Sequence, residues 1–84
     1  MKTHTVESLR AELDALDEAL ISLIAERTYL ARAIGDLKVS KGEPRVTTAR
    51  EITLTSKYKA LGPHGLAVAD ALLRLSRGAA SGGV

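Results

Sequence analysis

One long helix with an apolar seam constrains this chain more than any other feature of its sequence. From Val6 to Leu37 there is no proline and only one glycine, Gly35, and Thr5 is a suitable N-cap. Along this stretch, positions that alternate in steps of three and four carry apolar side chains, with the single exception of Arg27: 6, 9, 13, 16, 20, 23, 27, 30, 34 and 37. This spacing is typical of a helix that packs along a partner helix. Because an unpaired buried charge is costly, Arg27 indicates either an ion pair across the seam or a binding site.

The chain is too short to cover this helix by itself. Its 84 residues are enough for one small domain, whereas a helix of about 32 residues is about 48 Å long. There is no Phe, Trp or Cys, so the core consists mainly of Leu, Ile, Val and Ala, without a disulfide. That composition favours helices. We therefore expect one domain over residues 1–84 that oligomerises, with residues 1–4 and 79–84 flexible.

Two shorter helices are predicted after the long one. Lys, Gly, Glu and Pro at 41–44 indicate a loop. Thr48 and Glu51 match a capping box at the start of a second helix, which glycine and proline end at 61–63. Apolar spacing then predicts a third helix over 65–77. The expected fold class is all-α, with three helices per chain intertwined as a homodimer.

The charges are unevenly distributed along the chain. The net charge is +2, but residues 1–30 hold six acids and three bases, whereas residues 31–59 hold seven bases and three acids. The basic part is either a solvated face or a pocket for a small anion. There is no basic run or set of stacking aromatics, so we expect no nucleic-acid partner. The sequence has no signal peptide and no stretch of about 18 apolar residues, which predicts a cytoplasmic protein without membrane contact.

The sequence lacks the usual catalytic constellations. It has no cysteine nucleophile, no glycine-rich phosphate loop and no histidine pair at metal-ligand spacing, so we expect no metal and no cofactor. What remains is a set of cations near the apolar faces, with one adjacent acid: Arg10, Arg27, Lys38, Arg50 and Glu51. Each also has an ordinary interpretation, as a surface residue, a structural ion pair or, for Glu51, a helix-capping carboxylate.

Helical geometry relates these cations to one another. Arg27 and Lys38 are eleven residues apart, which places them within about 20° on one stripe and about 16 Å apart along the helix. Their long side chains can clamp a small dianion. Arg10 lies about 25 Å from Arg27 on the same helix, too far to share a small ligand. In an antiparallel pair of long helices, however, Arg10 of one chain approaches Arg27 of the other. Arg50 can fold over this stretch through the 41–47 loop.

Taken together, these residues resemble the all-helical AroQ class of chorismate mutases. The resemblance is carried by Leu9-Arg10, Leu13, Leu16-Asp17, Leu20, Ala25-Glu26-Arg27, Ile34-Gly35-x-x-Lys38 and Arg50-Glu51. The turn at 61–65 and the ending at 72–78 resemble the short subfamily of that class. The resemblance implies conversion of chorismate to prephenate, and for the short subfamily an activating complex with DAHP synthase. The same scaffold leaves open a 4-amino-4-deoxychorismate mutase, an isochorismate pyruvate-lyase or a non-catalytic helical dimerisation module.

The resemblance also implies a role for each site residue. Arg27 and the partner chain's Arg10 bind the substrate carboxylates, and Lys38 contacts the ether oxygen and a carboxylate. Arg50 supports the anionic side of the pocket, and Glu51 accepts a hydrogen bond from the ring hydroxyl. Two features depart from the family pattern. Thr47 stands where many members have an acidic residue, and the chain contains no glutamine, whereas many members place one on the third helix. Either a backbone group or a side chain of segment 74–81 substitutes for the glutamine, or the site is incomplete.

Overall fold

The structure is a computed structural model and describes residues 4–77. In this range the chain forms three α-helices and one short 3-10 helix, with no strand: α1 (Val6–Ser40), α2 (Thr48–Tyr58), η1 (Lys59–Leu61) and α3 (Gly65–Arg77). The prediction of an all-α chain with one long and two shorter helices is confirmed. The segments 1–3 and 78–84, which cover most of the residues expected to be flexible, lie outside the described residues.

Helix α1 begins at the predicted cap and ends directly before the predicted loop at 41–44. The Thr5 hydroxyl accepts a hydrogen bond from the backbone N–H of Ser8 at 3.0 Å, and the Ser8 hydroxyl accepts one from the N–H of Thr5 at 2.9 Å. This reciprocal pair satisfies N–H groups that a helix start leaves unpaired. The helix continues through Gly35 and past Leu37 to Ser40, so Lys38 is still held on a helical face.

The predicted capping box at Thr48 and Glu51 is wrong. Thr47 is the N-cap, with extended backbone, and its side chain makes no capping hydrogen bond. Since Thr48 is the first helical residue, Glu51 is one position beyond the third residue, which a capping box requires. Its carboxylate pairs with Arg77 on α3 instead. The Glu51 side chain therefore links α2 to α3 and does not cap the start of α2.

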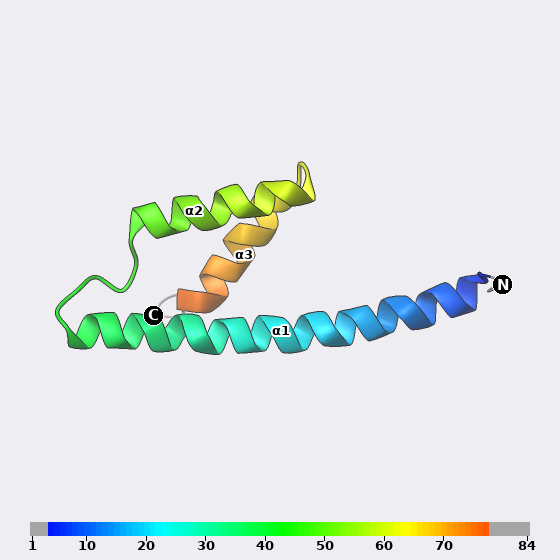
Figure 1. Cartoon of the computed structure of the whole chain (residues 1–84), viewed down its shortest axis with the longest axis horizontal. Coiled ribbons are helices and arrows are strands. Elements are labelled where there is room, and N and C mark those ends of the chain that lie inside the picture. Colours follow the sequence, from blue (N-terminus) through cyan, green and yellow to red (C-terminus); the bar gives the residue numbers. More distant parts are fainter. Residues whose placement is uncertain (1–3, 78–84) are drawn as a thin grey trace.

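Helix α3 lies between the other two helices and holds them together. It contacts both α1 and α2, whereas α1 and α2 do not pack directly against each other in residues 4–77. Figure 1 shows α2 and α3 gathered over the C-terminal half of α1. The buried apolar side chains are few: Leu54 of α2 and Ala69 and Leu72 of α3. Because α1 and α2 are separated, the space between them can form a site.

Gly65 allows the close approach that starts α3. A Cβ atom at this position would lie 1.9 Å from the carbonyl oxygen of Tyr58, so no larger residue fits without moving a helix. Before it, Gly62 has a φ of 98°, in the region that favours glycine. The turn between η1 and α3 thus depends on both glycines, which explains why the chain can reverse within so few residues.

The apolar seam of α1 lies open in the single chain. Its side chains are about half exposed or more, including Leu13 at 56%, Leu16 at 66% and Leu23 at 60%. The chain exposes 6812 Å² in all, whereas a compact chain of 8.9 kDa exposes about 4,800 Å². The N-terminal half of α1 has no other element over it (Figure 1). None of the helices in residues 4–77 combines the length and apolar character that crossing a bilayer requires.

Candidate active site

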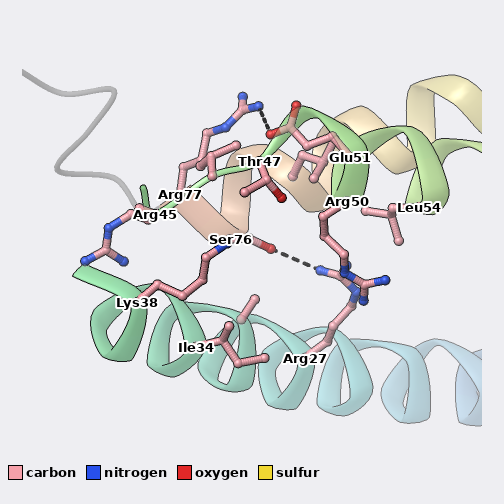
Figure 2. Close-up of a pocket in the computed structure, with 13 residues that line it drawn as sticks. Arg27, Ile34, Lys38, Arg45, Thr47, Arg50, Glu51, Leu54, Ser76 and Arg77 are labelled. Atoms are coloured by element: carbon pink, nitrogen blue, oxygen red, sulfur yellow. Dashed lines mark hydrogen bonds and ion pairs between the residues drawn. The ribbon is translucent and has the colours of Figure 1, made fainter. Parts of the chain in front are cut away.

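A cavity lies between α1 and α2, with the end of α3 as its third wall. Its empty volume is about 680 Å³, part of which is open to solvent. Helix α1, the loop with α2, and α3 supply its lining in turn: Arg27, Ala31, Ile34 and Lys38; Arg45, Val46, Thr47, Arg50, Glu51 and Leu54; Leu73, Ser76 and Arg77. Cations and one acid thus share a cavity with apolar side chains from every helix, as Figure 2 shows.

Of the six residues that the sequence predicts for the site, the structure brings five together. Arg27, Lys38, Thr47, Arg50 and Glu51 all line this cavity. Arg10 does not: it is exposed on the uncovered N-terminal half of α1 and remote from the cavity. This division follows from the length of α1, since Arg10 and Arg27 are about 25 Å apart along one helix.

The Arg27 guanidinium is held by α3 and not by an acid. Its Nη1 donates a hydrogen bond to the Ser76 hydroxyl at 3.0 Å, and that hydroxyl donates to the Leu72 carbonyl oxygen at 2.8 Å. Within residues 4–77, no ion pair involves Arg27. The structural ion pair considered as its alternative role is therefore not formed inside the described chain. Arg27 is half-buried, and its charge remains available to a ligand.

Lys38 and Arg50 add two further cations on facing walls. Figure 2 shows Lys38 rising from α1 and Arg50 extending from α2 toward α1, on the same cavity as Arg27. Neither takes part in an ion pair in the described part of the chain. Three cations without acidic partners in one partly enclosed cavity create a positive potential, which favours a small anion with more than one charge.

Glu51 is the one acid among the cavity-lining residues. Its side chain is 26% exposed, and its Oε2 accepts a hydrogen bond from Nη2 of Arg77 at 2.5 Å. An ionised carboxylate offers about four acceptor sites on two oxygens, so the contact with Arg77 leaves acceptor sites for a further partner. The site therefore combines cations for carboxylates with one acceptor for a hydroxyl group.

Arg45 fastens the 41–47 loop to α1. Its guanidinium pairs with Asp36, and its side chain crosses directly over the buried Gly35. A Cβ at position 35 would lie 2.6 Å from Nη1 of Arg45 and 3.0 Å from its Cγ. The glycine that weakens the helix pattern thus makes room for the side chain that anchors the loop carrying Thr47.

Sequence reasoning did not select Arg45, Ser76 or Arg77 as site residues. Ser76 had a usable signal, because it is a polar residue at a position where the third helix repeats apolar residues. Arg77 is the next residue in the chain and the last residue of α3. Both belong to segment 74–81, which was expected to replace the missing glutamine, and both line the cavity. Arg45 gave no periodic signal, since it lies in a loop.

Comparisons with known proteins agree with this geometry. Residues 9–77 match the family Chorismate mutase type II. The intracellular chorismate mutase of Mycobacterium bovis is 37% identical over 73 residues, covering 87% of this chain and 70% of that protein. The intracellular chorismate mutase of Mycolicibacterium smegmatis is 39% identical over 74 residues, covering 87% of this chain and 71% of its own length.

A solved structure gives the same result for the fold. It is a chain of the non-covalent complex of DAHP synthase and chorismate mutase from Corynebacterium glutamicum with a bound transition state analog. The TM-score is 0.83 at 30% identity, covering 87% of this chain and 89% of that one. Against these relatives, the aminodeoxychorismate mutase, the pyruvate-lyase and the non-catalytic module are not favoured. The chain belongs to the type II chorismate mutases and is an isomerase that converts chorismate into prephenate.

Proposed function

We propose that the cavity between α1 and α2 is the site at which this chain rearranges chorismate. The observation that carries the proposal is the convergence of Arg27, Lys38 and Arg50 on one cavity, without acidic partners in residues 4–77, opposite the single carboxylate of Glu51. Chorismate is a dianion with a ring hydroxyl, so its polar groups match this set. Thr47 lines the same cavity, and in our proposal its hydroxyl and backbone face the ring side of the substrate.

The reaction suits a site that has no nucleophile. One C–O bond breaks and one C–C bond forms within a single molecule, and no proton is transferred. The enzyme accelerates it by holding the flexible enolpyruvyl group over the ring, and by placing a cation where negative charge develops on the ether oxygen. In our proposal Lys38 is that cation, and Arg27 binds a substrate carboxylate. Arg50 supports the anionic side of the pocket, and Glu51 accepts a hydrogen bond from the ring hydroxyl.

Removing the central cation tests the site. Arg27→Ala is expected to lower kcat/KM at least about a hundredfold, because it removes a charged group that binds the transition state. The control is Lys57→Ala, which removes an exposed positive charge of α2 outside the cavity. Chorismate consumption and prephenate formation are measured together with helicity. Near-wild-type turnover by a folded Arg27→Ala protein would exclude this cavity as the active site.

We further propose that two chains pair through α1 and complete each site. The support is the open seam of α1, whose leucines need a cover, and the remote position of Arg10. In an antiparallel pair, Arg10 of the partner chain reaches the Arg27 end of the cavity. Mixing inactive Arg10→Ala and Arg27→Ala chains is then expected to restore activity, since one of the two sites in a mixed dimer is intact. No restoration despite subunit exchange would mean that each site belongs to one chain.

We also propose that a DAHP synthase binds this chain and raises its turnover. The support is the similarity to the Corynebacterium glutamicum complex, in which the two enzymes are bound non-covalently. Titrating the cognate synthase into the mutase assay tests this, and unchanged turnover would count against it. We also propose that residues 1–84 form one domain, since the family match spans 9–77. Finally, we propose an intracellular location, because the relatives from Mycobacterium bovis and Mycolicibacterium smegmatis are named intracellular chorismate mutases.

A further inference from the structure

Arg77, the last residue of α3, forms an ion pair with Glu51 of α2. We infer that Arg77 is a positioning residue, whose guanidinium holds the Glu51 carboxylate in the orientation that receives the substrate hydroxyl. This inference rests on the proposed function, because it needs Glu51 to contact the substrate. It adds a residue that acts through Glu51.

The geometry of the pair is that of a specific contact between helices. Nη2 of Arg77 lies 2.5 Å from Oε2 of Glu51, and the two residues are 26 positions apart in the chain. Their side chains are 40% and 26% exposed, so water screens the pair only in part. Hydrogen bonds between two ionised groups are shorter and stronger than neutral ones. The orientation of the carboxylate is therefore tied to the end of α3.

The pair also forms part of a wall. Glu51, Leu73 and Arg77 line the active-site cavity and also a neighbouring hollow between α2 and α3. The two ionised groups, with Leu73, therefore separate the substrate cavity from that hollow. Without Arg77, the flexible Glu51 side chain could turn into the hollow. Losing the pair is thus expected to misplace the acceptor without removing it.

The chemistry of the carboxylate allows both contacts at once. Nη2 of Arg77 contacts Oε2 of Glu51, and an ionised carboxylate has further acceptor sites on its second oxygen. A free glutamate side chain rotates about several bonds and loses that freedom when it binds a ligand. The ion pair restricts Glu51 before the substrate arrives, so less ordering is left for the binding step.

The same helix supplies a matched control. Arg74 is also in the last turn of α3, but it pairs with Asp70 on its own helix, with side chains 76% and 55% exposed. Arg74 does not line the cavity. Arg74→Gln therefore removes the same charge and an ion pair from the same helix, while leaving Glu51 as it is. An effect specific to Arg77 must exceed the effect of Arg74→Gln.

A double-mutant cycle tests the inference. Arg77→Gln, Glu51→Gln, the double variant, Glu51→Ala, Arg77→Lys and Arg74→Gln are compared by kcat, KM and thermal unfolding. Arg77→Gln is expected to lower kcat/KM about tenfold, and Arg77→Lys to recover part of the loss. Arg74→Gln is expected to leave kcat/KM unchanged. In the Glu51→Gln background, Arg77→Gln is expected to have little further effect, because its action passes through the carboxylate.

The other possible outcomes show whether the proposed role of Glu51 or the inferred role of Arg77 is wrong. If Glu51→Ala, which removes the acceptor altogether, keeps full activity, the proposed role of Glu51 fails first. If Glu51→Gln is impaired but Arg77→Gln resembles Arg74→Gln, Arg77 does not position the acid. An additive loss in the double variant, or a lower melting temperature with unchanged kcat/KM, makes Arg77 a structural link only. A higher kcat/KM in Arg77→Gln overturns the inference, because Arg77 then competes with the substrate for Glu51.

Discussion

The Ser76 hydroxyl accepts a hydrogen bond from Nη1 of Arg27 at 3.0 Å, across 49 positions of the chain. The same hydroxyl donates its proton to the Leu72 carbonyl oxygen at 2.8 Å, so its lone pairs face the guanidinium. A small side chain of α3 therefore fixes the direction of the central cation on α1, and it does so without neutralising the charge. The orientation of the Arg27 guanidinium therefore depends on how α3 packs on α1.

Ser76→Ala is expected to lower kcat/KM roughly tenfold, because hydrogen bonds to charged groups contribute about 1.5–3 kcal/mol. Steady-state kinetics with chorismate measure the effect. The matched control is Thr53→Ala, since the Thr53 hydroxyl makes the same type of bond to a carbonyl four residues earlier, Ala49, but lies outside the cavity. Equal losses in both variants would show that only helix stability had changed.

Gly35→Ala is expected to lower kcat/KM about threefold with little change in melting temperature. Alanine improves helix propensity by about 1 kcal/mol, but its Cβ displaces the Arg45 side chain that anchors the 41–47 loop. Kinetics and thermal unfolding are measured together. The change is also made in an Arg45→Ala chain, where it is expected to cost no further activity. A further loss there would mean that the glycine matters for another reason.

Gly65→Ala is expected to lower the free energy of unfolding by about 3 kcal/mol, as in other overpacked sites. The cause is the clash of the new Cβ with the Tyr58 carbonyl oxygen. Gly62→Ala is the comparison, because position 62 has open space and only an unfavourable backbone conformation, which costs about 1–3 kcal/mol. Urea denaturation ranks the two variants. The steric explanation fails if Gly62→Ala is the more destabilised protein.

Leu16→Glu is expected to weaken the proposed dimer at least about a hundredfold, since each buried leucine contributes about 1.5–3 kcal/mol and both chains carry the change. Pairing Arg10 with the partner's Arg27 places the twofold axis near residues 18 and 19, so Leu16 lies close to the centre of the seam. Sedimentation and activity are measured against protein concentration. Ser22→Glu adds the same charge to α1 off the seam and is expected to dimerise normally. A monomeric wild-type chain with full activity would refute the shared site.

Local spacing accounts for what could be predicted at the site. Arg27 and Lys38 share one stripe because they are eleven residues apart on a rigid helix, and both line the cavity. Arg50 and Glu51 form a recognisable motif, but for Glu51 the sequence left a helix-capping role open beside the site role, and the capping role is wrong. Its capping role needed a helix start one residue later than Thr48, and the geometry of the loop decided that boundary.

The sequence by itself determined the seam of α1, the ends of α3 and the set of cations, because helical periodicity and turn residues act over a few positions. Only the tertiary structure decided which side chains meet across the cavity. Ser76 reaches Arg27, Arg77 reaches Glu51 and Arg45 crosses Gly35 because α3 and the loop cross α1 and α2 at particular angles. Those angles depend on how α3, with its buried Ala69 and Leu72, packs against α1 and α2, and the local spacing of residues does not predict that packing.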